Sequence, residues 1–99
     1  MENLTHIFEI QYTKAAEKFF TVHEDVRIKY EEAVKSLMFG EHHESVDVKR
    51  IKGKRSIYYR IRLGEWRVIY TIIDGRIIVV LTLLAGARGD VYKKAGSLR

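Results

Sequence analysis

The sequence contains no cysteine, and this absence excludes both a disulfide framework and a metal site built on thiolates. A chain without cysteine fits the cytoplasm, and we expect a cytoplasmic location. The N-terminus lacks the basic and then apolar pattern of a signal peptide. The longest apolar run, from Ile77 to Ala87, includes a threonine and is too short to span a bilayer. We therefore expect no membrane partner.

Several active-site motifs are missing as well. The glycine-rich phosphate-binding patterns GxxxxGK[ST] and GxGxxG do not occur, and no Ser-His-Asp or Cys-His arrangement stands out. The neighbours His42 and His43 are weak metal candidates, because adjacent side chains point in different directions in most backbones. The carboxylates near them are those of Glu41, Glu44 and Asp47. We expect no metal site and no small-molecule cofactor.

The composition that remains is that of an ordinary globular domain. The 99 residues, 46% apolar and 31% charged, suffice for a single domain over residues 1–99 with a buried core. The net charge of +5 is unevenly distributed. Residues 1–45 carry 5 Lys and Arg against 9 Asp and Glu, whereas residues 46–99 carry 13 against 4. A basic half beside an acidic half indicates a polyanionic partner such as nucleic acid.

Two turn signals divide the stretch from Ile57 to Tyr92 into three strands. Asp74-Gly75, between the apolar runs IYTII and RIIVV, predicts a two-residue type I′ turn. Gly64-Glu65, between YYRIRL and WRVIY, fits a two-residue type II′ turn. Loops of this length fix which residues lie opposite one another.

The predicted register places apolar side chains on one face, which we expect to be the core face. Across the Gly64-Glu65 turn the expected pairs are Leu63 with Trp66, Ile61 with Val68, Tyr59 with Tyr70, and Ile57 with Ile72. Across the Asp74-Gly75 turn we expect the same face to continue through Ile77, Val79, Leu81 and Leu83.

The other face carries arginines. Arg62 should lie opposite Arg67 with Thr82 third in the row, and Arg60 should lie opposite Ile69. Like charges that face each other on a sheet are destabilising by a few tenths to about 1 kcal/mol. The face is either a solvated basic surface or a pre-formed site for a phosphate-bearing partner. From this pairing alone, replacing Arg62 or Arg67 by alanine should leave the melting temperature unchanged or slightly raised.

The N-terminal half reads as a strand followed by two helices. Ile7 to Tyr12 alternates apolar and polar residues, as a strand does, and Thr13 to Phe20 has helical spacing. Thr21 and Glu24 have the spacing of a capping box, which predicts that a second helix starts there. Its apolar stripe consists of Val26, Tyr30, Ala33, Val34 and Leu37, and Gly40 follows as the C-terminal cap.

Residues 41–56 read as a polar connector with a dense positive charge. Its basic residues are candidates for nucleic-acid binding: Lys49, Arg50, Lys52, Lys54 and Arg55. The complete pattern predicts an α+β fold in which a helical hairpin packs on one face of a small, mainly antiparallel twisted sheet, in the order βααβββ.

Four short motifs follow one another in the second half. They are the basic connector KRIKGKRS, the strand YRIR, the strand WRVIY, and the late GAR followed by Val91-Tyr92. This order resembles the RelE/ParE superfamily of toxins from toxin–antitoxin pairs, in particular its RelE branch. With the preceding strand and helices, the resemblance covers essentially the whole chain.

The resemblance implies a toxin of a type II toxin–antitoxin system that enters the ribosome and cleaves mRNA there without a metal. It implies three partners, which are the ribosome, mRNA and a cognate antitoxin protein. The family's functional positions correspond by motif to Arg60, Arg62, Arg67, Arg88 and Tyr92. The implied chemistry is attack of an RNA 2′-OH on the adjacent phosphate.

The sequence differs from well-studied active members, which carry lysine at the positions of Arg60 and Arg62. Lysine can lose a proton when its pKa is depressed, whereas arginine effectively cannot. Proton transfer then falls to the remaining candidates, which are Glu65, Asp90 and Tyr92. Two other functions stay open, a ParE-like inhibitor of DNA gyrase and a non-catalytic basic RNA-binding module.

Overall fold

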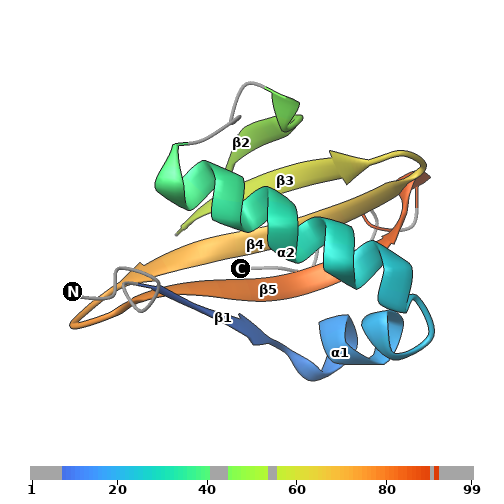
Figure 1. The fold of residues 1–99 in the computed structure, drawn as a ribbon, viewed down its shortest axis with the longest axis horizontal. Helices are drawn as coiled ribbons and strands as arrows, with labels where there is room; N and C mark the ends of the chain where they lie inside the picture. Colours follow the sequence, from blue (N-terminus) through green and yellow to red (C-terminus); the bar gives the residue numbers. More distant parts are fainter. Residues whose placement is uncertain (1–7, 41–44, 54–55, 90, 92–99) are drawn as a thin grey trace.

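The computed structural model describes residues 8–40, 45–53, 56–89 and 91 (Figure 1). Within them the order is one strand, two helices and four strands. The elements are β1 (Phe8–Tyr12), α1 (Lys14–Thr21), α2 (Glu24–Phe39), β2 (Val48–Lys52), β3 (Ile57–Leu63), β4 (Trp66–Asp74) and β5 (Ile78–Ala87). None of the helices in these ranges is long and apolar enough to cross a membrane.

The strands form one five-stranded sheet in the order β1-β5-β4-β3-β2. β1 pairs with β5 in parallel, and the other neighbours are antiparallel. The predicted α+β class with a mainly antiparallel sheet is therefore confirmed. The sheet has one strand more than βααβββ, because part of the connector forms β2 at the sheet edge. An edge strand needs only one partner, so it tolerates exposed charges such as Lys49 and Arg50.

The first helix is anchored to the sheet by its N-terminal cap. Thr13 Oγ1 accepts a hydrogen bond from the Ala16 N–H (3.2 Å) and donates one to the Leu83 carbonyl (2.7 Å). The Thr13 N–H donates to the Thr82 carbonyl at 2.9 Å. The helix predicted over Thr13 to Phe20 is thus confirmed within one residue, and its start is tied to β5.

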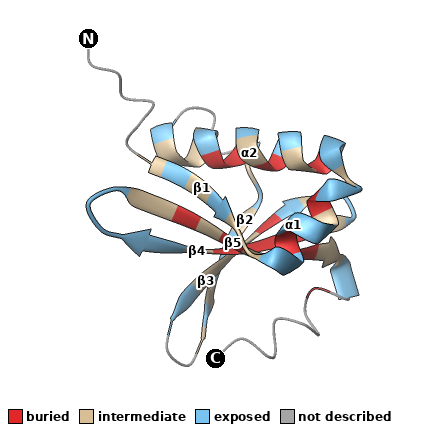
Figure 2. Cartoon of the chain, turned by 90° about the horizontal axis from the view of Figure 1, so that it is seen from below, coloured by how far each residue is buried: buried red, intermediate tan, exposed pale blue. Residues whose placement is uncertain are grey.

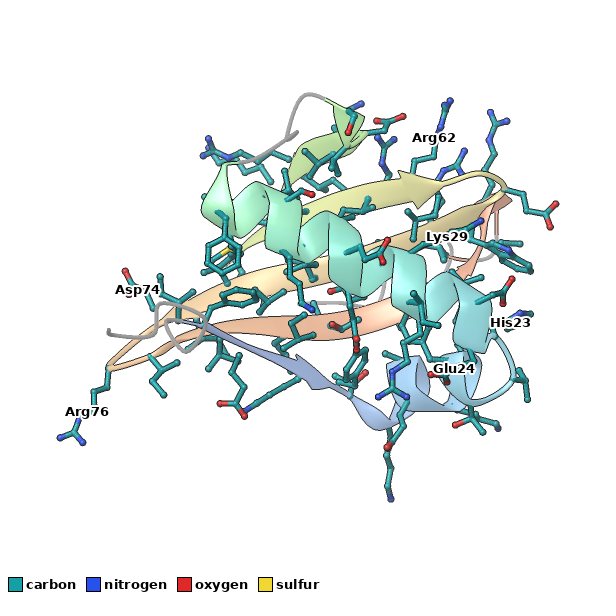
Figure 3. All side chains as sticks on the ribbon, in the orientation of Figure 1. His23, Glu24, Lys29, Arg62, Asp74 and Arg76 are labelled. Carbon is teal, nitrogen blue, oxygen red and sulfur yellow. The ribbon has the colours of Figure 1, made fainter. Side chains whose placement is uncertain are left out.

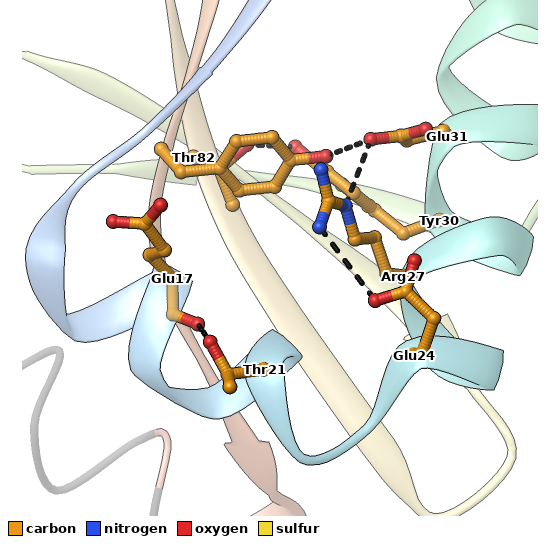
Figure 4. Close-up of polar contacts among 8 residues, drawn as sticks. Glu17, Thr21, Glu24, Arg27, Tyr30, Glu31 and Thr82 are labelled. Carbon is orange, nitrogen blue, oxygen red and sulfur yellow. Dashed lines mark hydrogen bonds and ion pairs between the residues drawn. The ribbon is translucent and has the colours of Figure 1, made fainter.

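The second helix starts at Glu24 without the predicted capping box. Thr21 belongs to the last turn of α1, where its Oγ1 donates to the Glu17 carbonyl at 2.8 Å (Figure 4). The N-cap is His23, whose side chain makes no capping hydrogen bond. The C-terminal prediction is confirmed, since Gly40 has a left-handed φ of 76° and its N–H donates to the Ser36 carbonyl.

Both helices bury their apolar stripes on the same face of the sheet (Figure 2). Tyr30 is fully buried and stacks on Phe20 of α1, with their ring centroids 5.7 Å apart. The core beneath combines four residues of α2 with residues of β3, β4 and β5: Val26, Tyr30, Ala33, Val34, Ile61, Val68, Tyr70, Val80 and Ala85. The predicted stripe of α2 is confirmed as the packing surface.

The predicted two-residue turn at Gly64-Glu65 and the register next to it are confirmed. The pairing of β3 with β4 runs from Leu63 to Tyr59 and does not extend to the predicted pair of Ile57 with Ile72. Leu63 pairs with Trp66, Ile61 with Val68, and Tyr59 with Tyr70. Gly64 has a φ of 64°, the left-handed value that both primed hairpin turns require at their first central position. The alternation of β3 and β4 therefore follows from a local signal.

The predicted two-residue turn at Asp74-Gly75 is wrong. Asp74 still belongs to β4 and pairs with Ile78, so the loop has three residues, Gly75 to Ile77. Gly75 does not adopt a left-handed φ. The expected core positions of β5 are consequently shifted: Val80, Thr82 and Ala85 face the helices in place of Ile77, Val79, Leu81 and Leu83.

Helix packing explains this shift. Thr82 is fully buried, and its Oγ1 shares a 2.7 Å hydrogen bond with the Tyr30 hydroxyl. A break in register beside Ile69 and Tyr70 then lets the small Ala85 lie opposite Val68 beneath the helices. Burial raises the pKa of Tyr30 well above its usual value, so the phenol stays protonated. The contact between Tyr30 and Thr82, which are 52 residues apart in the sequence, thus overrides the turn preference of Asp74-Gly75.

A polar cluster ties β1 to α2 on the helix side (Figure 4). The Tyr12 hydroxyl donates to the Glu31 carboxylate. Arg27 pairs with Glu31 (3.3 Å) and Glu24 (3.6 Å), and its guanidinium lies 5.3 Å from the centre of the Tyr12 ring. Burial and then the hydrogen bond to Glu31 raise the pKa of Tyr12.

We predict that Thr82→Val lowers the free energy of unfolding by about 1–3 kcal/mol, because the buried Tyr30 hydroxyl loses its partner. Thr71→Val is the matched control, since the Thr71 hydroxyl donates to the Ile57 carbonyl at an exposed position. Urea denaturation measures both. The double variant Tyr30→Phe with Thr82→Val should recover part of the loss, and additive losses would contradict this account.

Candidate functional site

The site is built on the face of the sheet opposite the helices, which we call the arginine face after Arg60, Arg62 and Arg67. Arg62 lies opposite Arg67, and Arg60 lies opposite Ile69, as the sequence predicts. Thr82 does not complete the row, because the shifted register of β5 places Gly86 opposite Arg67. Arg60 and Arg62 share a face because they are two residues apart on one strand.

Asp47 is the residue of the site that sequence reasoning missed. Its Oδ1 lies 2.8 Å from Arg60 Nη2, and its Oδ2 lies 3.1 Å from Arg62 Nε. The Asp47 carbonyl also accepts a hydrogen bond from the Arg62 N–H at 2.9 Å. The residue precedes β2, and the register of β2 with β3 brings it beside Arg62. Asp47 lies between the alternating apolar residues Val46 and Val48, and this was the available signal, had the connector been read as a strand.

The environment of Arg60 is unusual for a charged side chain. Only 13% of the side chain is exposed, and within the described ranges its ion-pair partner is Asp47. The buried Arg60 Nε has no hydrogen-bond partner among the residues that the structure describes. A buried donor without a partner is costly, so the charge of Arg60 depends on its ion pair with Asp47.

Arg67 is placed differently from the other arginines. The residue is only 6% exposed, and its Nη1 donates to the carbonyls of Gly64 (2.7 Å) and Trp66 (3.0 Å). These two hydrogen bonds therefore stabilise the turn that joins β3 to β4. Since Arg62 bonds to Asp47 and Arg67 to the turn, each opposed arginine has its own acceptor, which reduces the expected cross-strand repulsion.

The segment after β5 also approaches the arginine face. Arg88 is exposed, and its N–H donates to the Glu65 carbonyl at 3.3 Å, which holds it beside the same turn. Val91 is fully buried, and a Cβ added to Gly86 would lie 3.2 Å from its Cγ2. Val91 therefore packs next to Arg67 on this face. Tyr92 and Asp90, both predicted site residues, lie outside the described residues.

The basic residues of the connector are divided between the two faces of β2. Lys49 lies opposite Arg60 and so belongs to the arginine face. Arg50 and Lys52 lie opposite Tyr59 and Ile57, which points them to the helix side. Lys54 and Arg55 lie outside the described residues. Of the five predicted nucleic-acid-binding residues, the structure brings Lys49 alone together with the arginines, within the part of the chain that it describes.

No cluster of three or more His, Cys, Asp or Glu that could hold a metal ion occurs among the described residues. What the arginine face offers is cationic N–H donors. Guanidinium groups match phosphate oxygens in planar, charge-assisted hydrogen bonds. The arrangement is suited to an anion with several oxygens that approaches Arg60 and Arg62 from solvent.

We predict that Arg67→Ala lowers the free energy of unfolding by about 1–3 kcal/mol, since it removes two hydrogen bonds of a buried charged group. This replaces the expectation from charge repulsion alone. Arg62→Ala is the matched control, because its half-exposed pair with Asp47 should change stability by less than about 1 kcal/mol. Chemical denaturation compares the two, and equal losses would refute the structural role of Arg67.

Comparison with known proteins supports the fold. The sequence matches no protein-family model and no curated protein. Among solved structures, it is similar to a chain of the RelB–RelE antitoxin–toxin complex from Methanococcus jannaschii, with 22% sequence identity and a TM-score of 0.55. The similarity covers 85% of this chain and 96% of that chain. The chain therefore has a RelE-like fold, as the resemblance of its motifs predicts.

Proposed function

We propose that this chain is the toxin of a type II toxin–antitoxin system and that it cleaves mRNA on the ribosome without a metal ion. The observation that carries the proposal is the placement of Arg60 and Arg62 side by side on the face of a RelE-like sheet opposite the helices, with Arg67 and Arg88 at the adjoining turn. The similar solved structure comes from a complex of an antitoxin with a toxin.

The proposed reaction is an internal transfer within RNA. The 2′-oxygen of one nucleotide attacks the adjacent phosphorus, the bond from phosphorus to the 5′-oxygen breaks, and a 2′,3′-cyclic phosphate and a 5′-hydroxyl are formed. Negative charge accumulates on the phosphate oxygens in the transition state. Fixed guanidinium groups stabilise such charge without reorganising, which is commonly the largest single contribution to catalysis. Arg60, Arg62 and Arg88 would supply it.

Protons must be moved by other groups, because arginine effectively cannot be deprotonated. Glu65 is the candidate that the structure describes: it is exposed at the turn between β3 and β4, and its carbonyl accepts the Arg88 N–H. Asp90 and Tyr92 remain candidates from the sequence. A base stacked on the Tyr92 ring would gain about 1–3 kcal/mol.

The ribosome would supply the orientation that this small surface lacks. A flexible RNA strand must be held with its 2′-oxygen in line with the departing 5′-oxygen, and such positioning is worth about 7–11 kcal/mol in well-oriented systems. One face of a five-stranded sheet offers few contacts for that purpose. Free RNA is therefore expected to be a poor substrate.

We predict that the chain cleaves mRNA on programmed ribosomes in excess EDTA, and that a single 2′-deoxy substitution at the cut site abolishes cleavage. Arg62→Ala and Arg88→Ala should each reduce the rate about 100-fold or more, as the loss of one charge-stabilising donor does elsewhere. Primer extension measures the cut. Arg76→Ala is the matched control, because Arg76 lies in the hairpin at the far end of the sheet (Figure 3).

Two results would contradict the nuclease proposal. One is wild-type protein that cuts no codon on the ribosome while it blocks supercoiling by DNA gyrase in a parallel assay, which would favour the ParE-like function. The other is RNA binding without cleavage in either assay, which would favour a non-catalytic binding module. A rate that falls equally with Arg76→Ala would show that only net charge matters.

We also predict that an antitoxin covers the arginine face in the cell. Such a partner should contribute a segment with Asp or Glu that approaches Arg60 and Arg62, or should displace the chain from Val91 onward. Co-expression with the neighbouring reading frame, followed by hydrogen exchange of the complex, checks this. β3 should gain protection, whereas a tight complex that leaves β3 as accessible as before would argue against the predicted binding mode.

A further inference from the structure

We infer that the Asp47 carboxylate occupies the place of a substrate phosphate in the free protein, and that RNA binds by displacing it from Arg60 and Arg62. The inference rests on the proposed function in one respect, namely that the bound anion is an RNA phosphate. Asp47 acts through the two arginines, so it is a positioning residue and not a catalytic one.

The geometry of the carboxylate resembles that of a bound phosphate. One oxygen contacts Arg60 Nη2 at 2.8 Å, and the other contacts Arg62 Nε at 3.1 Å. A single anionic group thus bridges two guanidiniums with two different oxygens. A phosphate with two non-bridging oxygens can make the same pair of charge-assisted bonds.

The carboxylate can leave more easily than the arginine it neutralises. The Asp47 side chain is 47% exposed, and its backbone is held independently by the hydrogen bond from the Arg62 N–H. Rotation of the side chain would release the carboxylate to solvent without separating β2 from β3. The Arg60 side chain, at 13% exposed, is held at the sheet surface and stays behind.

The state of Arg60 indicates why the free protein needs this carboxylate. A nearly buried guanidinium without a counter-ion would be costly, and its Nε already lacks a partner among the described residues. Asp47 therefore keeps the site assembled while no RNA is bound. A phosphate that replaces it neutralises the same charges.

The need to displace Asp47 should measurably weaken the binding of phosphate. While Asp47 is in place, the carboxylate and the two guanidiniums together carry one positive charge; once it is removed, they carry two. The protein with Asp47→Asn should therefore bind phosphate more tightly, and its affinity should depend more steeply on salt. A purely structural Asp47 predicts the opposite, because its loss would disorder the arginines and weaken binding.

The matched control is Asp74→Asn, which changes the net charge equally. Asp74 lies at the end of β4, distant from Arg62 (Figure 3). The probe is a short, fluorescently labelled 2′-O-methyl oligouridylate, which has no free 2′-hydroxyl and so cannot be cleaved. Fluorescence anisotropy over a series of salt concentrations measures its affinity for each variant, and thermal melting verifies that each is folded.

We expect Asp47→Asn to bind the probe about fivefold more tightly than Asp74→Asn at low salt. We also expect the slope of log affinity against log salt to be steeper by about 0.7, the value for one additional phosphate contact with a single strand. Asp47→Glu keeps the charge and should return toward wild-type affinity. Adding Arg62→Gln to Asp47→Asn should remove most of the gain.

Equal or weaker binding by Asp47→Asn than by Asp74→Asn would overturn the inference, as would a probe that binds none of the proteins at low salt. The proposed nuclease function is tested separately on the ribosome. If the fivefold difference is found and cleavage is not, Asp47 is still the carboxylate that phosphate displaces, and only the nuclease assignment fails.

Discussion

Backbone pairing across the turn at Gly64 determines how the two sides of this protein differ. Because Leu63 pairs with Trp66, every second side chain of β3 and β4 points toward the helices, and those between point away. Ile61 and Val68 thus become core residues, while Arg62 and Arg67 are placed on the opposite face. A slip of one residue would bury the arginines and expose the core. The fold and the candidate site therefore depend on the same few hydrogen bonds.

The sequence predicts this hairpin well because its signals are local. A glycine at the required φ and alternating residues on both sides specify the β3–β4 register without help from elsewhere. The β4–β5 register was not predictable in this way. It depends on the contact of Tyr30 with Thr82, and neither residue reveals its partner from its own neighbourhood. Asp74-Gly75 is a strong turn signal, yet helix packing decides where the chain turns.

In the candidate site, too, the features set by local sequence signals were predictable and those set by long-range contacts were not. Strand alternation is enough to bring Arg60, Arg62 and Arg67 to one face. It does not reveal that Arg67 bonds to its own turn, since that depends on side-chain burial. Nor does it reveal Asp47, which meets Arg62 only because a charged connector forms β2 and pairs with β3. The periodicity of apolar residues does not predict that a strand with few apolar residues, such as β2, pairs with β3.

The position of β2 at the sheet edge has a consequence for how copies of this chain meet. An unpaired edge strand offers free backbone groups that can join sheets of two molecules into one. Here that edge carries Lys49, Arg50 and Lys52 within five residues. A second copy that aligned its own β2 there would place cation against cation at close range. The positive charge of this strand therefore disfavours pairing of two copies of the chain edge to edge through β2.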